Sequence, residues 1–351
     1  LPLMKLKHLL PCALLPVLGS ALLSFQPAAD PRLAGAVRGE TKNGWIPVRL
    51  QGTPEQVGFQ HGYLLAKEIG DSLAVTRLEL THGSPRDWRF YRTAAEKILW
   101  PRVPEEYRRE IQGMSAGLAA RGVKADALDL TVLNANIELG YYTAWLDRSG
   151  KPAAPDRCSA FVATGSYTRD GKIVIGHNNW SGYLEGARWN IIFDIRPANG
   201  HRILMDGFPG FIHSGDDFGM NSAGLVITET TITAFHGFDP KGVPEFARAR
   251  RAMQYASSID EFAAVMREGN NGGYANAWLV ADLNRNEIGR LELGLKNVTL
   301  EKSRDGYFVG ANFPVLPKLA AEETDFAVKD MSVSANARRV RWEQLMAQYK
   351  G

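Results

Sequence analysis

The sequence pattern changes near residue 158, and this change limits the possible folds more than any other feature. Over residues 44–148, apolar residues recur mostly at helical spacing. After Cys158, short β-prone runs follow one another, and turn-forming dipeptides such as Asp170-Gly171 and Asn199-Gly200 separate them. We therefore expect an α-rich segment over 37–157 and a core with antiparallel strands over 158–351.

Individual elements can be predicted from the same patterns. The expected helices cover residues 57–73, 89–100, 105–120, 127–146, 245–255, 259–267 and 335–348. The expected strands cover residues 159–166, 172–180, 189–196, 201–207, 225–232, 277–283, 287–295, 298–303 and 307–311. Two groups of strands flanking a helical pair fit two stacked antiparallel sheets with helices outside, as one α+β domain. In the first helix, Gly58 and Gly62 share a face and predict close packing there.

Residues 1–36 have the pattern of a secretory signal peptide. A short basic start precedes a mostly apolar stretch over 9–23, which Pro11 and Pro16 interrupt, and small residues follow. The apolar stretch is too short and too broken for a comfortable membrane span. We therefore expect a secreted or periplasmic protein without stable membrane insertion.

Charge and ligand spacing exclude several classes of protein. The formal net charge is only +3 over 351 residues, so binding to nucleic acid is not indicated. The histidines and cysteines show no zinc spacing, and Asp216-Asp217 lacks the further carboxylate of an EF-hand loop. Walker and dinucleotide-binding motifs do not occur in a fitting context. The sequence therefore predicts neither a metal nor a cofactor.

Cys158 is the only cysteine that remains when the leader is discounted. In an exported chain it has no intramolecular disulfide partner, and a spare thiol is a liability unless chemistry uses it. Cleavage of the Arg157–Cys158 bond would make it a new N-terminal residue. The alternative is a small buried apolar residue, and the cysteine count leaves both possibilities open.

His177 is the first candidate partner for this thiol. One strand, a turn and a return strand separate it from Cys158, so the two residues are expected on adjacent antiparallel strands. An imidazole beside a thiol favours the nucleophilic thiolate. The alternative is a histidine that caps a strand end.

Two strand ends supply candidate groups for an oxyanion site. Thr231 ends the expected strand 225–232, where a hydroxyl and a backbone N–H can face a reacting carbonyl. Asn276 begins the next strand after a Gly-rich turn, and a strand-end amide is a plausible oxyanion donor. The alternative for Asn276 is a simple turn rich in Asn and Gly.

Four further residues are candidates for substrate binding. Trp180, Tyr274 and Trp278 are expected to wall an apolar acyl pocket. Asp217 is the fourth candidate; it lies in a Gly-rich turn, where turn capping also explains an aspartate.

Several blocks, in order and with similar spacing, resemble the phospholipase B-like proteins. They are residues 58–66, Cys158-Ser159-Ala160, His177-Asn178-Asn179-Trp180, Ser214-Gly215-Asp216-Asp217-Phe218 and Tyr274-Ala275-Asn276-Ala277-Trp278. More distantly, Gly219-Met220-Asn221-Ser222-Ala223-Gly224-Leu225 resembles the penicillin V acylase and bile-salt hydrolase family, with the acyl-CoA:6-aminopenicillanate acyltransferases.

The resemblance implies an N-terminal-nucleophile hydrolase with a four-layer αββα sandwich that cleaves itself before Cys158. It also implies that Thr231 and Asn276 are oxyanion residues and that a late arginine belongs to the site. Arg338 matches that arginine, and Arg339 is nearly as good a match. The acylases place an aspartate where His177 falls, so the base arrangement is expected to differ.

The function implied by the resemblance is hydrolysis of an acyl ester or amide bond, through a thioester on Cys158, in a lipid or an N-acyl amide. The two cleavage fragments are expected to stay associated. A non-enzymatic lipid-binding or carrier protein, cleaved only for maturation, is the competing class. A surface interaction module with a structural cysteine is a third possibility.

Overall fold

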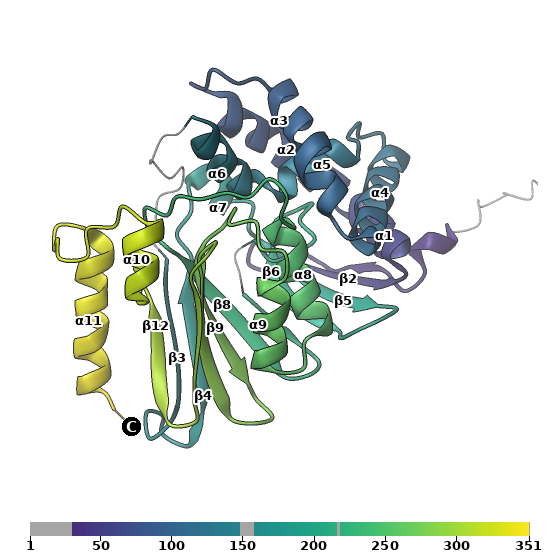
Figure 1. The fold of residues 1–351 in the computed structure, drawn as a ribbon. Coiled ribbons are helices and arrows are strands. Elements are labelled where there is room, and N and C mark those ends of the chain that lie inside the picture. The colour runs from purple at the N-terminus through teal and green to yellow at the C-terminus, as the bar shows by residue number, and fades with distance from the viewer. Residues whose placement is uncertain (1–29, 148–157, 216–217, 351) are drawn as a thin grey trace, which may run out of the picture. The chain divides into compact units, whose positions relative to one another are not determined.

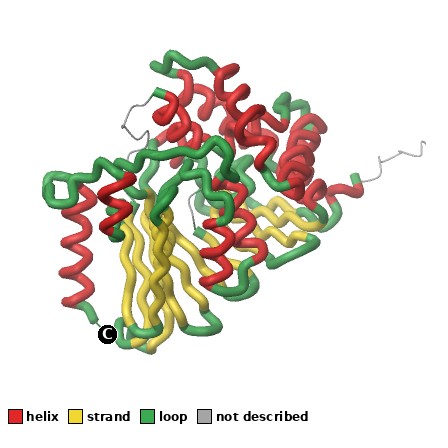
Figure 2. Tube along the Cα trace, viewed as in Figure 1, coloured by secondary structure: helices red, strands yellow, loops and turns green. Residues whose placement is uncertain are grey.

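The computed structural model describes residues 30–147, 158–215 and 218–350. The chain divides into a short unit, Leu1–Pro31, and a main unit, Arg32–Gly351, which contains two sheets. The large sheet has nine strands in the order β1-β2-β5-β6-β7-β8-β9-β10-β11, and the small sheet has the order β12-β3-β4 (Figures 1 and 2). Neighbouring strands are antiparallel, except for the parallel pair β2–β5.

The strands of the large sheet are β1 (Val37–Arg38), β2 (Ile46–Gly52), β5 (Ile191–Pro197), β6 (Ile203–Gly207), β7 (Gly219–Asn221), β8 (Leu225–Thr231), β9 (Asn276–Asp282), β10 (Glu287–Leu293) and β11 (Val298–Ser303). Those of the small sheet are β3 (Ser159–Gly165), β4 (Gly171–Asn178) and β12 (Gly306–Gly310).

The α-helices are α1 (Pro54–Leu64), α2 (Ala66–Thr81), α3 (Trp88–Ala94), α4 (Glu105–Ala120), α5 (Ala127–Asn134), α6 (Asn136–Leu146), α7 (Tyr183–Gly186), α8 (Glu245–Tyr255), α9 (Ile259–Arg267), α10 (Pro317–Glu323) and α11 (Ser334–Gln348). Shorter helical turns are Pro31–Leu33, Ala95–Leu99 and Trp100–Arg102.

The two sheets stack face to face between two helical layers. On one side of β3, Ala160 packs in a cluster with Leu279 of β9, which joins the sheets. On its other side, Phe161 meets Trp342 of α11 with ring centroids 5.4 Å apart. On the far face of the large sheet, Trp278 packs against Phe262 of α9. The predicted α+β fold with αββα layers is therefore confirmed, and the layers follow one another from α11 to α9 in Figure 1.

The N-terminal segment is α-rich, as expected, and it also extends the large sheet. β2 pairs in parallel with β5, with Ile46 opposite Ile191. Its buried residues alternate with exposed ones, which is the pattern of a half-buried strand. Pro47 obscured this strand in the sequence, because proline argues against a strand interior.

Four glycines allow α1 and α4 to pack with their backbones in contact. A Cβ added at Gly58 would lie 1.8 Å from the Glu110 carbonyl oxygen, and one at Gly113 would lie 2.4 Å from that of Glu55. Gly62 and Gly117 face each other's helix in the same way. Side chains at these positions would force the helices apart, so the close packing predicted from Gly58 and Gly62 is confirmed.

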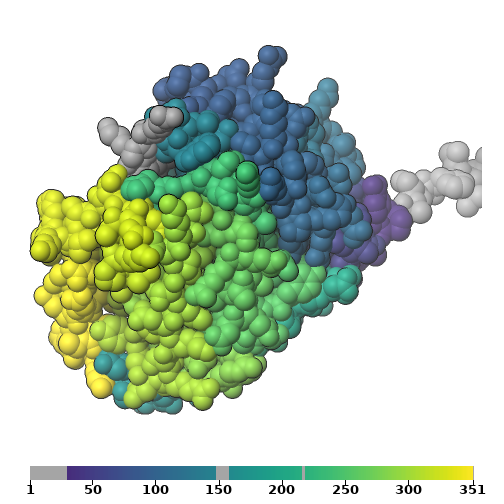
Figure 3. All heavy atoms as spheres, viewed as in Figure 1, coloured from purple at the N-terminus to yellow at the C-terminus, as the bar shows by residue number. Residues whose placement is uncertain are grey.

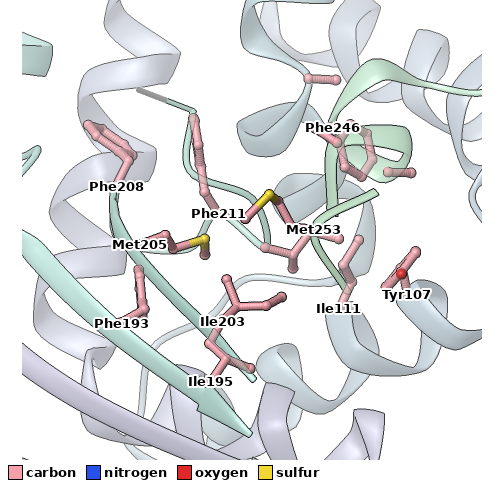
Figure 4. Packing of buried hydrophobic residues seen from close by; sticks show 14 of the residues in the cluster. Tyr107, Ile111, Phe193, Ile195, Ile203, Met205, Phe208, Phe211, Phe246 and Met253 are labelled. Atoms are coloured by element: carbon pink, nitrogen blue, oxygen red, sulfur yellow. The ribbon is translucent and has the colours of Figure 1, made fainter. Parts of the chain in front are cut away.

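The largest hydrophobic cluster joins the N-terminal helices to the sheet and to α8. Figure 4 shows Ile111 of α4 and Met253 of α8 beside Phe193 and Met205 from strands β5 and β6. In Figure 3, the blue N-terminal residues adjoin the green residues from the middle of the chain over one continuous surface. The segments before and after Cys158 therefore share one core.

A buried polar group, which we call the bridge cluster, also crosses between these segments. It consists of Glu110 of α4 with Arg250 and Gln254 of α8. Arg250 Nη2 donates to Glu110 Oε2 at 3.1 Å, Nε to Gln254 Oε1 at 3.1 Å, and Nη1 to the Ile212 carbonyl at 2.8 Å. Burial raises the pKa of Glu110 to about 7, although Arg250 opposes the shift.

Candidate active site

Cys158 is half-buried and immediately precedes β3. Ala160 faces the large sheet, so strand alternation directs the Cys158 side chain toward the same side. The Cys158 carbonyl accepts a hydrogen bond from Arg338 Nη1 of α11. The thiol therefore lies at the end of the small sheet, where the two sheets meet, and it is not sealed in the core.

Arg338 organises the main chain around Cys158. Besides the Cys158 carbonyl, its guanidinium contacts Ser159 Oγ at 3.2 Å and donates from Nη2 to Asn312 Oδ1 at 3.0 Å. Arg339 instead pairs with Glu343 at 3.0 Å on the same helix. Of the two candidate arginines, Arg338, the better match in the sequence, is the one that contacts Cys158.

Asn312 is a site residue that the sequence reasoning missed. It is fully buried, follows β12 closely, and donates from Nδ2 to the Thr231 carbonyl at 2.8 Å. Its φ is +66°, in the left-handed region that asparagine tolerates better than most residues. Asn312 thus links Arg338 to the end of β8. Its only sequence signal was an asparagine just after the last predicted strand.

His177 lies on β4, directly opposite Ala160, as the hairpin pattern predicted. Extending the register places Cys158 one diagonal step from His177, and such neighbours lie roughly 7–8 Å apart. The imidazole hydrogen-bonds the backbone of Glu229, and burial lowers the pKa of His177 to about 4. The ring is therefore neutral near pH 7, and its buried Nε2 has no hydrogen-bond partner within residues 158–215, 218–350 or 30–147.

Thr231 and Asn276 lie opposite each other where β8 ends and β9 begins. Thr231 Oγ1 is 3.1 Å from the Tyr274 hydroxyl, which donates to Glu229 Oε1 at 2.7 Å. Asn276 is fully buried, and neither atom of its carboxamide has a partner in the described part of the chain. An unpaired buried amide costs about 1–3 kcal/mol, and the Asn276 carboxamide therefore has hydrogen-bonding capacity that the described residues do not use.

A chain of hydrogen bonds leads from the Cys158 carbonyl through Arg338 and Asn312 to the Thr231 carbonyl. Among the described residues, this chain does not reach the Asn276 carboxamide. By strand alternation, Asn276 shares its face with Trp278, on the side of α9. We use the name strand-end cluster for His177, Thr230 and Asn276, which share one property: each lies near a strand end and has a buried polar atom without a partner among the described residues. Thr230 and Asn276 lie on opposite faces of the large sheet.

Two of the expected pocket aromatics lie elsewhere. Trp278 is fully buried against Phe262, because its position on β9 faces α9, and it belongs to the main core. Trp180 follows β4 in a loop and is 59% exposed. Tyr274 alone of the three lies beside Thr231. Asp217 lies outside the described residues.

The described residues contain no group of three or more His, Cys, Asp or Glu side chains that could hold a metal ion. Among the same residues, no helix has the length and apolar character needed to cross a membrane.

Comparison with known sequences points to one family. The family model described as Phospholipase B matches residues 96–296. An uncharacterized protein of Archaeoglobus fulgidus is 27% identical over 293 residues, which are 76% of this chain and 45% of that protein. Phospholipase B-like 1 of Homo sapiens is 28% identical over 122 residues, covering 32% of this chain and 22% of the human protein. The chain thus spans less than half the length of these relatives.

Among solved structures, a variant of conjugated bile acid hydrolase from Clostridium perfringens is similar to part of the chain. The match covers 47% of this chain and 56% of the hydrolase, with 15% sequence identity and a TM-score of 0.31.

Proposed function

Because the chain belongs to the phospholipase B family, we propose that it is a hydrolase with Cys158 as an N-terminal nucleophile. The proposed reaction is cleavage of an acyl ester or amide bond, in a lipid or an N-acyl amide, through an acyl-thioester on Cys158. The observation that carries the proposal is the anchoring of Cys158 by Arg338, within a network that also includes Asn312 and Thr231. A cysteine with a purely structural role does not require that an arginine from a different layer of the fold donate a hydrogen bond to its carbonyl oxygen.

Maturation creates the nucleophile in this proposal. The Cys158 thiol attacks the carbonyl carbon of Arg157, an S–C bond forms, and the peptide C–N bond breaks. The nitrogen takes up a proton and becomes the α-amine of Cys158. Water then hydrolyses the thioester, which restores the thiol and leaves a carboxylate on Arg157.

Turnover uses the new α-amine as the base. The reference pKa of an α-amine is about 8, so it can accept the thiol proton near neutral pH. The thiolate attacks the acyl carbonyl, the leaving group takes the proton, and water hydrolyses the thioester. His177, neutral because of its lowered pKa, presents Nε2 as an acceptor that orients the amine.

The oxyanion of each tetrahedral intermediate needs preorganised donors. We assign this role to the end of β8 at Thr231 and to the Asn276 carboxamide, whose buried Nδ2 has no partner among the described residues. Removal of one such donor typically costs about 3 kcal/mol of transition-state stabilisation. Asn312 holds Arg338 and Thr231 in register and is a positioning residue.

The two fragments are proposed to remain together after cleavage. β2 contributes a full strand pairing to β5, and Arg250 pairs with Glu110 in the core. Export of the protein to the periplasm or outside the cell is part of the same proposal, because the leader pattern favours it.

Turnover of a panel of acyl esters and N-acyl amides tests the proposal against the lipid-carrier alternative. Wild-type protein should release the acyl group from at least one member, and Cys158→Ser should lose this activity. A cleaved protein that binds lipid but hydrolyses none of the panel would support the carrier.

A further inference from the structure

An open cleft lies where α6, the segment after β8, and α10 come together. Its volume is about 990 Å³, near the upper end of the range for small-molecule sites. Its apolar lining includes Tyr141 and Trp145 of α6, and Phe235 and Phe238 after β8. Trp145 is 45% exposed, so part of this apolar surface faces solvent.

The aromatic side chains form one wall, because Tyr141, Phe235 and Phe238 belong to the same buried hydrophobic cluster. The ring centroids of Tyr141 and Phe235 are 6.0 Å apart, and those of Trp145 and Phe238 are 6.2 Å apart. These rings have a large apolar area. Because they pack on one another, they also have low conformational freedom. Such a wall suits a flexible hydrocarbon chain, which gains contacts along its length.

The wall is continuous with the candidate active site. The ring of Tyr141 lies 6.5 Å from that of Tyr274, whose hydroxyl contacts Thr231. Phe235 follows Thr231 by four positions, so their Cα atoms are at most about 14 Å apart. Thr233, between them, donates its N–H to the Asn312 carbonyl at 3.2 Å. An amphiphile in the cleft therefore has its reactive end within reach of the site.

The charged lining of the cleft is acidic. Glu323 is engaged by the backbone N–H groups of Leu295, Lys296 and Asn297. The other lining residues that carry charge are Glu322, Asp325 and Lys296. His236, also in the lining, lies 3.6 Å from Asp325, and Glu322 accepts a hydrogen bond from Asn297 Nδ2 at 2.9 Å. Carboxylates attract an ammonium group by charge, and the neighbouring aromatic rings attract it through cation–π interactions.

We propose that this cleft binds the hydrocarbon chain of a single-chain amphiphile and favours a head group that carries an ammonium charge. If the proposed function holds, such an amphiphile is also the substrate that Cys158 attacks, and this part of the inference rests on the proposed function. The binding itself does not, because it needs no reaction.

Calorimetric titration with dodecylphosphocholine below its critical micelle concentration tests the binding. Both the wild type and Cys158→Ala should bind it, and dodecyl phosphate should bind at least fivefold more weakly. Phosphocholine, which lacks the chain, should not bind measurably. Absence of dodecylphosphocholine binding would overturn the proposal, and equal affinity for dodecyl phosphate would overturn the preference for an ammonium head.

Variants locate the site. Trp145→Ala should weaken dodecylphosphocholine binding at least tenfold, and Ala144→Trp should do so by filling the cleft. Trp45→Ala is the matched control, because Trp45 is 41% exposed and lies outside the cleft lining. Unchanged affinity in both cleft variants would place the binding elsewhere. The two proposals can fail separately: wild-type protein that binds dodecylphosphocholine but hydrolyses no member of the acyl panel would refute the proposed function and leave the cleft assignment intact.

Discussion

The bridge cluster and the strand-end cluster both contain buried polar side chains, but only in the bridge cluster do these side chains hydrogen-bond to one another. In the bridge cluster, Arg250 donates to three acceptors and joins α8 to α4. In the strand-end cluster, His177 Nε2, Thr230 Oγ1 and the Asn276 carboxamide have no partner in the described part of the chain. Native proteins leave few buried polar groups unpaired. The first cluster therefore stabilises the fold, whereas under the proposed function the second supplies groups for the nascent amine and the substrate.

The largest effect on stability should come from breaking the bridge cluster. Glu110→Ala leaves Arg250 buried without its partner carboxylate and should lower the free energy of unfolding by about 3–5 kcal/mol. Chemical denaturation measures this change. The control is the double variant Glu110→Leu with Arg250→Met, which should recover most of the loss, since apolar pairs can replace a buried ion pair. If Glu110→Ala were as stable as the wild type, the bridge cluster would not have the stabilising role that we assign to it.

Asn276→Ala should show the opposite behaviour. We expect a loss of about 10²–10³ in kcat, because a proposed oxyanion donor is removed. Stability should change little, since the amide makes no hydrogen bond with the described residues. Turnover and denaturation, measured on the same preparation, separate the two effects.

Asn312→Ala is the matched comparison for Asn276→Ala, because its amide is fully engaged with Arg338 and Thr231. It should lower both stability and activity. If Asn276→Ala keeps full activity while Asn312→Ala retains its fold and loses turnover, the oxyanion role belongs to Asn312.

His177 predicts a pH dependence of stability. Its pKa is lowered from 6.5 to about 4 in the folded state, so the unfolded chain binds a proton that the native state excludes. Its contribution to stability is complete above pH 6.5 and decreases as the pH falls toward 4. The stability difference between wild type and His177→Gln should therefore change by up to about 1.4 kcal/mol per pH unit over this range. Denaturation at several pH values measures it, and a constant difference would contradict the buried neutral imidazole.

Arg338→Lys should have the smallest effect of the series. Lysine keeps the charge but cannot contact Cys158, Ser159 and Asn312 in the same planar geometry. We expect a roughly 10–100-fold loss of kcat, of the order that one positioning contact contributes. Arg339→Lys is the control and should retain activity, because Arg339 pairs with Glu343 instead. Equal losses in the two variants would indicate a general charge effect.

Local patterns predicted most of the core, and long-range contacts account for what they missed. α8, α9 and β11 have the predicted bounds, because their amphipathic patterns are regular and their ends are marked. Two predicted helices divide, at Leu65 and at Ala135, where the backbone leaves helical geometry. Strand β7 has only three residues and depends on its neighbours, so the sequence did not reveal it.

The site was less accessible to sequence reasoning than the fold. The hairpin register placed His177 beside the start of β3, because strand and turn lengths fix it locally. Asn312 and the choice of Arg338 depend on how α11 packs across β3, which no local pattern encodes. Trp278 was assigned to a pocket because the pattern of β9 does not show which of its two buried faces lies under α9.

The account depends on Cys158 becoming an N-terminal residue, and intact-mass analysis of the purified protein with N-terminal sequencing tests this most directly. We predict a downstream fragment that begins at Cys158 with an unblocked α-amine, and a single uncut chain for Cys158→Ala. Full hydrolase activity from an uncut wild-type chain, or normal fragments from Cys158→Ala, would contradict the account.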